Sequence, residues 1–124
     1  MIHHLKEQNL AEKAVLVGLI HQNQNEEKVT EYLDELSFLS ETAGAEVTKI
    51  FTQKLSQPDK RTFIGKGKLE EVKDFIEAND INLLIFDDDL SPSQTFNIEK
   101  EVKINVVDRS VFILDNFALT LILI

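Results

Sequence analysis

The sequence predicts an α/β domain of three layers, in which helices flank a mostly parallel sheet of four strands. Runs of apolar and β-branched residues alternate along the chain with patterns of helical period. The connections between them are short, which favours parallel strands joined by right-handed crossovers, in the spatial order 2-1-3-4. The four expected strands cover residues 13–20, 45–55, 82–86 and 104–107.

The first half of the chain contains one strand–helix–strand unit. Its first apolar run is continuous, as is typical of a strand covered on both faces. Asn25 or Glu26 is expected to cap the next helix, whose apolar residues recur every three or four positions from 29 to 43. Gly44 suits the left-handed residue that follows a helix end, and the β-branched and aromatic residues of 45–55 indicate the second strand.

The second half repeats this alternation. The helix after the second strand is expected to end at about Asn79. Ser91 and Gln94 form the pattern of a capping box around Pro92, which suits the first position of a helix. This third helix is expected to run to about Lys103, directly before the last strand.

Composition divides the chain into three parts. Residues 1–12 are expected to form a flexible N-terminus, residues 13–108 the α/β domain, and residues 109–124 a final helix, capped by Ser110, with an apolar C-terminal tail. The tail is far shorter than the about 20 residues that span a bilayer, and the N-terminus lacks the pattern of a signal peptide. With no cysteine in the sequence, we expect a cytoplasmic protein without membrane association.

One segment is basic in an acidic protein whose formal net charge is −9. Residues 54–68 carry +4, so the remainder carries −13. Glycines in this segment can adopt positive φ or permit close backbone approach, and a helix is expected to begin beside them, where free N–H groups favour an anion such as phosphate. The alternative is that these lysines are simply solvated. The candidate contacts to phosphate or RNA are Lys54, Lys60, Arg61, Gly65, Lys66, Gly67 and Lys68.

Polar residues after the later strands form a second group. Asp87, Asp88 and Asp89 are weak candidates for binding Mg²⁺, which prefers carboxylate oxygen. We expect them instead to stabilise the N-terminus of the following helix, and we expect Asp108 and Arg109 to form an ion pair that fixes the final helix. No pattern pairs a nucleophile with a base, so the sequence predicts no catalytic residue and no resident metal.

Four segments occur in one order along the chain. They are SFLSETAGAEV with the following Gln53 (37–53), PDKRTFIGKGKLEEV (58–72), IFDDDLSPSQTFNIE (85–99) and VVDRSVFILDNFA (106–118). Together they resemble the N-terminal domain of the HflX family of ribosome-associated GTPases. The resemblance extends over roughly residues 13–118.

The resemblance implies a cytoplasmic translational GTPase that binds the large ribosomal subunit and helps to split or rescue ribosomes. In that family the N-terminal domain approaches ribosomal RNA, and a later domain with a P-loop binds GTP and Mg²⁺. This sequence contains no G-x-x-x-x-G-K-S/T pattern, so we expect no cofactor and no GTP hydrolysis by this chain alone. The family residues that carry over are Arg61, Gly65, Lys66, Gly67 and Lys68.

The chain departs from the family pattern after residue 118, where it continues with the apolar residues 119–124 in place of a charged helical hairpin. This departure leaves open a truncated or frame-shifted relative, a stand-alone paralogue, or a fragment. It also suggests a homodimer formed through the tail, because an exposed apolar patch promotes association. Two alternatives to ribosome or RNA binding therefore stand: a small domain that binds nucleotide phosphates, and a remnant that only dimerises.

Overall fold

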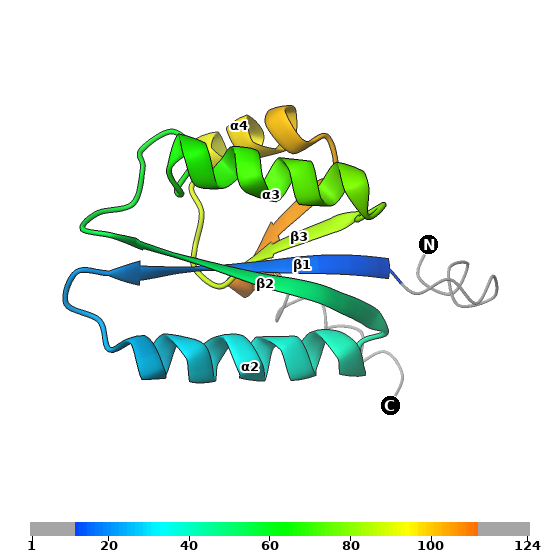
Figure 1. Cartoon of the computed structure of the whole chain (residues 1–124), viewed down its shortest axis with the longest axis horizontal. Helices are drawn as coiled ribbons and strands as arrows, with labels where there is room; N and C mark the ends of the chain where they lie inside the picture. Colours follow the sequence, from blue (N-terminus) through cyan, green and yellow to red (C-terminus); the bar gives the residue numbers. More distant parts are fainter. Residues whose placement is uncertain (1–11, 112–124) are drawn as a thin grey trace.

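The structure is a computed structural model that describes residues 12–111. Within these residues strands and helices alternate along the chain, as Figure 1 shows. The elements are β1 (Glu12–His21), α2 (Glu26–Thr42), β2 (Ala45–Leu55), α3 (Lys66–Ala78), β3 (Leu83–Phe86), α4 (Pro92–Val102) and β4 (Asn105–Asp108).

The described strands form one parallel sheet in the order β2-β1-β3-β4. This confirms the predicted α/β class and the predicted strand order. β1 lies inside the sheet, and its residues from 14 to 20 are all buried, which explains its continuous apolar run. The chain leaves β1 for β2 on one side and returns to β3 on the other, so the loops after β1 and β3 begin side by side at the carboxyl edge of the sheet.

Helices cover both faces of the sheet. Figure 1 shows α2 below the sheet and α3 with α4 above it. The two faces of β1 therefore belong to different cores: Leu16 packs with Leu33 and Leu36 of α2, whereas Val17 packs with Val72 of α3 and Ile98 of α4. Burial of these side chains on both faces supplies the main stabilisation of the three-layer fold.

The caps that the sequence predicted are present. The Asn25 side chain accepts a hydrogen bond from the backbone N–H of Glu27 at 2.8 Å, and Gly44 follows α2 with a φ of 103°. Ser91 and Gln94 form both halves of the capping box at the start of α4. These local bonds explain why the sequence located the ends of α2 and the start of α4 within one residue.

Two expectations for the segment after β4 are wrong. Helical backbone begins at Arg109, and the carboxylate of Asp108, not the hydroxyl of Ser110, accepts the capping hydrogen bond, from the Val111 backbone N–H at 3.0 Å. Asp108 also accepts from the backbone N–H of Leu90, so it does not form the expected ion pair with Arg109. The guanidinium of Arg109 instead reaches across the sheet edge to the carboxylate of Asp87.

A β-bulge interrupts the pairing of β2 with β1. Ala14 is opposite Val47 and Val15 is opposite Lys49, so Thr48 is an extra residue in β2. The Thr48 hydroxyl donates to the carbonyl of Ala14 at 3.1 Å, which joins the extra residue to β1. Because of the bulge, Val47 and Ile50 both face α2 although three positions separate them. β2 is an edge strand within the described sheet.

Some expectations fall outside residues 12–111. The flexible N-terminus, most of the final helix, the apolar tail and dimerisation through that tail all depend on residues that the structure does not describe. Among the described helices, none has both the length and the apolar character to cross a membrane.

Candidate functional site

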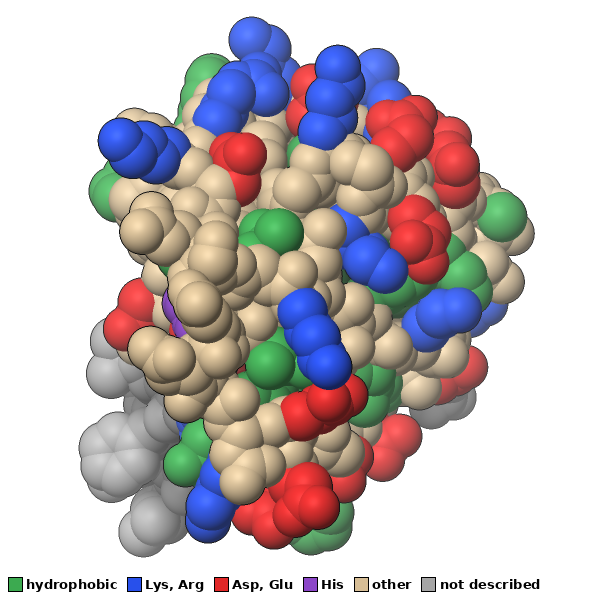
Figure 2. Space-filling view, turned by 60° about the vertical axis from the view of Figure 1, so that its left-hand side comes forward, with side chains coloured by type: hydrophobic (Ala, Val, Ile, Leu, Met, Phe, Trp, Pro, Cys, Tyr) green, Lys and Arg blue, Asp and Glu red, His purple; other side chains and the backbone are tan. Residues whose placement is uncertain are grey.

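The candidate site lies at the carboxyl edge of the sheet, which we call the rim. The rim consists of the loops that follow the four strands, at residues 22–25, 56–65, 87–91 and 109–111. Parallel strands end at the same edge, so residues far apart in the sequence meet there. Figure 2 views the molecule with this edge turned forward.

A tight turn shapes the segment between β2 and α3. The Asp59 carboxylate accepts hydrogen bonds from the backbone N–H groups of Arg61 at 2.8 Å and Thr62 at 2.9 Å. These two N–H groups, with the Thr62 hydroxyl, lower the pKa of Asp59. The acid that interrupts the basic segment is therefore a structural part of its turn, and it holds Lys60 and Arg61 at the surface.

Phe63, and not a glycine, adopts the left-handed conformation in this segment, with a φ of 65°. This backbone is unfavourable for a residue with a Cβ, at a cost of about 1–2 kcal/mol. Its side chain offsets the cost by burial and by an edge-to-face contact with Phe86 at 6.0 Å between ring centroids. The turn is also fixed to α4, because Gln94 donates to the carbonyl of Asp59 and Asn97 to that of Arg61.

Neither glycine of this segment has positive φ, and Gly65 fits the other expected purpose, a close approach. Gly65 is the N-cap of α3 in extended conformation, and its N–H donates to the Gln53 side chain at 2.8 Å. A Cβ at Gly65 would lie 3.0 Å from the Gln53 amide nitrogen, so glycine permits this close approach. Gly67 lies in the first turn of α3 with open space around it. Gln53 was part of the family pattern, but no pattern in the sequence indicated its hydrogen bond with Gly65.

The structure separates the five basic residues among the predicted contacts into two groups. Two lysines have carboxylate partners: Lys54 pairs with Glu26 at 3.0 Å, and Lys68 pairs with Glu71 at 3.1 Å. Lys60, Arg61 and Lys66 are exposed, and none of them takes part in the ion pairs formed within residues 12–111. We call these three residues the rim cations.

The charge distribution over this face is uneven. Figure 2 shows basic side chains along its upper edge, on the side of α3 and α4, with acidic side chains to their right. The lower part, on the side of α2, is mainly acidic. The net charge of −9 therefore does not describe the surface around the rim cations.

The three aspartates after β3 point to different partners. Asp87 lies 3.2 Å from the guanidinium of Arg109, and Asp89 accepts a hydrogen bond from Ser110. They do not cap α4, whose first turn is capped by Ser91. Within residues 12–111 no group of three His, Asp or Glu side chains is arranged to hold a metal ion.

Asp87 and Arg109 form a partly buried ion pair that the sequence did not predict. The Asp87 side chain is 4% exposed and that of Arg109 is 32% exposed. Arg109 also lies 3.9 Å from Glu35 and 5.5 Å from the ring centre of Tyr32, both on α2. Burial raises the pKa of Asp87, and Arg109 opposes the rise. The Asp87 oxygen facing Arg109 lacks the alignment of a hydrogen bond, so the contact is mainly electrostatic.

Asp88 lies where the loops after β1 and β3 begin. Desolvation raises its pKa to about 6, against the opposing effect of His21. The folded protein therefore binds this proton more tightly than the unfolded chain does, and ionisation of Asp88 opposes folding above about pH 6.

Asp88→Asn is expected to raise the free energy of unfolding at pH 7 by about 1 kcal/mol, a small value because solvent screens a partly exposed carboxylate. The gain should shrink towards pH 4, where Asp88 is protonated in the folded wild type. Urea unfolding of the wild type and the variant at pH 7 and pH 4 measures this gain in stability. An equal gain at the two pH values would mean that ionisation of Asp88 is not the cause.

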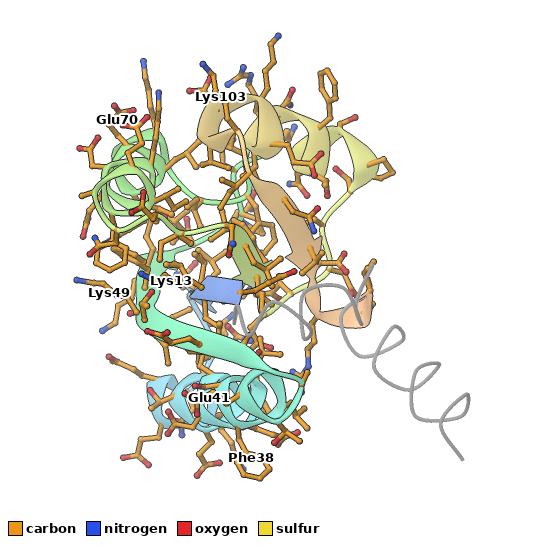
Figure 3. All side chains as sticks on the ribbon, turned by 90° about the vertical axis from the view of Figure 1, so that its right-hand side faces the viewer. Lys13, Phe38, Glu41, Lys49, Glu70 and Lys103 are labelled. Carbon is orange, nitrogen blue, oxygen red and sulfur yellow. The ribbon has the colours of Figure 1, made fainter. Side chains whose placement is uncertain are left out.

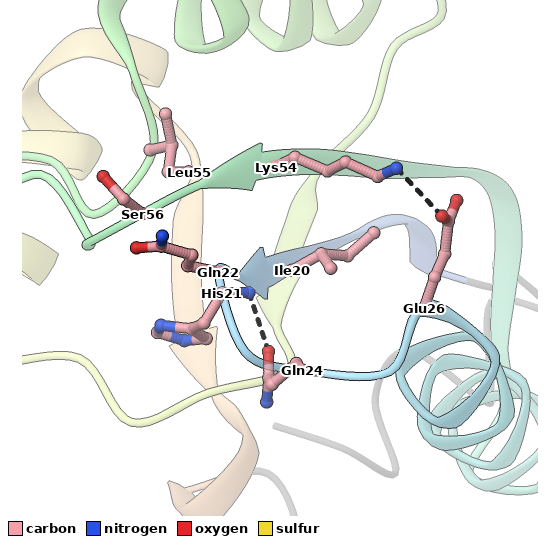
Figure 4. Close-up of a pocket in the computed structure, with 8 residues that line it drawn as sticks. All are labelled: Ile20, His21, Gln22, Gln24, Glu26, Lys54, Leu55 and Ser56. Carbon is pink, nitrogen blue, oxygen red and sulfur yellow. Dashed lines mark hydrogen bonds and ion pairs between the residues drawn. The ribbon is translucent and has the colours of Figure 1, made fainter.

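One pocket of about 430 Å³ opens at the ends of β1 and β2. Figure 4 shows its lining: the ion pair of Lys54 with Glu26 lies on one side, and Gln24 accepts from the His21 backbone on the other. Only Lys54 among the lining residues was a predicted site residue. The rule that ligands bind beyond the carboxyl ends of strands is the signal that could have identified the others. They are Ile20, His21, Gln22, Gln24, Glu26, Leu55 and Ser56.

Comparison with known proteins decides the family. Residues 30–118 match the family described as GTP-binding GTPase N-terminal. The chain belongs to this family. It is the N-terminal domain found in HflX, as the sequence resemblance predicted.

HflX relatives are similar over most of this chain. The GTPase HflX of Flavobacterium psychrophilum is 50% identical over 107 residues, which are 86% of this chain and 26% of that protein. The GTPase HflX of Escherichia coli is 36% identical over 107 residues, which are 86% of this chain and 24% of that protein. The chain thus spans about a quarter of the length of these relatives.

Solved structures share the fold of this HflX domain. A GTP-binding protein from the archaeon Sulfolobus solfataricus, solved in complex with GDP, is 27% identical with a TM-score of 0.62. The matched part is 86% of this chain and 30% of that one. The structure described as the SsGBP and GDP complex is 28% identical with a TM-score of 0.66 and covers 87% of this chain and 29% of that one.

Proposed function

We propose that this chain is the ribosome-binding or RNA-binding module of an HflX-type GTP-binding protein, and that its rim contacts RNA of the large ribosomal subunit. The observation that carries the proposal is the grouping of Lys60, Arg61 and Lys66. They are exposed at one edge of the sheet, next to the start of α3, without carboxylate partners among the described residues.

Electrostatics supports contact at this rim and not over the whole surface. RNA phosphates attract local cations, and each neutralised phosphate releases counterions, which makes the affinity fall with salt. The acidic α2 side would repel the same polyanion, so it would orient the domain with α3 and α4 towards RNA. Lys54 and Lys68 remain proposed contacts, but an RNA phosphate would have to compete with Glu26 and Glu71 for them.

GTP binding and hydrolysis belong, in this proposal, to the remainder of an HflX-type protein. The relatives are named GTPases, and this chain covers about a quarter of their length. The P-loop pattern is absent from its sequence, and neither glycine–lysine step is followed by Ser or Thr. We therefore assign no nucleotide or Mg²⁺ to this chain and expect no catalysis by it alone.

The variant Arg61→Glu with Lys66→Glu tests the rim. It should weaken binding to large ribosomal subunits by about a hundredfold at moderate salt, because two attractive contacts become repulsive. Co-sedimentation with purified large subunits over a range of KCl concentrations measures the loss and the salt slope.

Lys13→Glu with Lys28→Glu is the matched control. It changes the net charge by the same amount, but Lys13 lies at the opposite edge of the sheet and Lys28 on α2. Its affinity for large ribosomal subunits should stay within about threefold of the wild-type value, because salt screens charges that lie far from the contact. Equal losses in the two double variants would contradict a specific rim contact.

One observation favours the alternative of nucleotide-phosphate binding. The N-cap of α3 is a glycine without a side-chain cap, and the space around Gly67 is open. Free N–H groups in such a first turn favour an anion. Adding millimolar GTP or ATP to the sedimentation assay tests it. Competition with the ribosomal subunit at the rim would favour this alternative.

A further inference from the structure

The outward face of α4 carries an aromatic side chain beside a cation, and a second cation follows at the end of the helix. Phe96 and Lys100 have the i and i+4 spacing that places side chains on one face of a helix, and Lys103 is the C-cap residue in left-handed conformation. All three are exposed. Phe96 is 63% exposed, and the Lys100 ammonium lies 5.9 Å from the centre of its ring. Neither lysine is part of an ion pair within residues 12–111.

The basic turn of the rim packs against α4. Asn97, next to Phe96, donates to the Arg61 carbonyl at 3.1 Å, and Gln94 one turn earlier donates to the Asp59 carbonyl at 2.9 Å. The turn that carries two of the rim cations is therefore fixed against the same helix that presents Phe96. Its position does not depend on a flexible loop.

Within residues 12–111 a second phenylalanine, Phe38, is strongly exposed, and its surroundings are acidic. Phe38 is 68% exposed on α2, whose exposed residues include Glu31, Asp34 and Glu41. Figure 3 shows Phe38 pointing away from the sheet on the α2 side, near the labelled Glu41, and Lys103 on the α4 side. Of these two described phenylalanines, Phe38 lies among acids and Phe96 lies beside a lysine.

We propose that Phe96 stacks on an unpaired base of RNA while Arg61, Lys100 and Lys103 bind the neighbouring phosphates. The partner is single-stranded RNA, because a stacking ring needs a base that is free of its duplex neighbours. Lys100 lies over the face of the ring and can leave it for a phosphate, which frees that face for the base. This inference rests on the proposed function and extends it from the rim along α4.

Fluorescence anisotropy with a labelled oligouridylate tests the inference, since this RNA has no stable structure of its own. An abasic strand of the same length serves as the second probe, because it has the same phosphates but no bases. Phe96→Ala should lower the affinity for oligouridylate about tenfold and leave the affinity for the abasic strand unchanged. Phe38→Ala removes the same ring from the acidic face and should change neither affinity.

Three outcomes would overturn the inference. Phe96→Ala could match Phe38→Ala on oligouridylate, it could weaken both probes equally, or the wild type could bind large ribosomal subunits without binding oligouridylate. In each case the rim proposal is judged separately, by the loss of subunit binding in Arg61→Glu with Lys66→Glu. If the wild type binds neither oligouridylate nor subunits, both proposals fail.

Discussion

Arg109→Leu is expected to lower the free energy of unfolding by about 3 kcal/mol, measured by urea denaturation at pH 7. Removing one partner of a buried ion pair leaves the other charge without compensation, and the cost usually exceeds the worth of the pair itself. The carboxylate left behind is that of Asp87, which is 4% exposed at the end of β3. The contacts of Arg109 with Glu35 and Tyr32 of α2 would be lost as well.

The double variant Asp87→Asn with Arg109→Leu separates the two contributions. It removes the buried charge together with its partner, so it should recover more than half of the stability that Arg109→Leu loses. Arg109→Leu should also raise the pKa of Asp87 further, which would make the loss smaller at acidic pH. A loss below about 1 kcal/mol at pH 7 would show that solvent reaches Asp87 and that the pair is not buried in solution.

Phe86→Ala is expected to lower the free energy of unfolding by about 3–5 kcal/mol, again measured by urea denaturation at pH 7. Phe86 is fully buried in the interior strand β3, and its truncation removes apolar contacts and leaves a cavity. It also removes the edge-to-face contact that holds Phe63 in its left-handed conformation. Hydrogen exchange should therefore increase at the amides of Arg61 and Thr62, which the turn protects in the wild type.

Phe96→Ala is the matched control for this truncation. It removes the same ring from the exposed face of α4, so stability should change by no more than about 0.5 kcal/mol. Equal losses of stability in Phe86→Ala and Phe96→Ala would contradict the burial of Phe86 in the core. A large loss at Phe86 without faster exchange in the turn would show that the Asp59 hydrogen bonds alone maintain its shape.

Much of the fold could be predicted because its signals are local. The apolar run of β1, the helical spacing in α2 and the capping box of α4 each depend on residues within one element or next to it. Strand order followed from the short crossovers, since few arrangements of parallel units satisfy them. The bulge at Thr48 gave no signal, because it depends on how β2 meets β1.

The site was harder to predict because its electrostatics depends on contacts between distant elements. The basic segment was visible, but the pairing of Lys54 with Glu26 joins β2 to α2 and could not be inferred from spacing. The partner of Arg109 was placed one residue away in the sequence, whereas it is Asp87, in the loop that follows β3. Positive φ at the glycines was one of two alternatives, and the left-handed residue of this segment is instead Phe63, whose ring packs against Phe86.

The rim and α4 together suggest how a strongly acidic domain could recognise a polyanion. Helix α4 presents its cations on the side away from α2, and hydrogen bonds from Gln94 and Asn97 fix the basic turn to it. A rigid cationic surface loses little conformational entropy on binding, so a few contacts can give useful affinity. The acidic part on the α2 side would disfavour other orientations on RNA.

The extra residue in β2 also bears on solubility. An edge strand of eleven residues offers free backbone groups to any other extended chain, and a straight one invites intermolecular sheet formation. The irregularity at Thr48 bends the strand. The ammonium groups of Lys49 and Lys54 add charge to the same strand. Deleting Thr48 would restore an even ladder and remove this protection against aggregation.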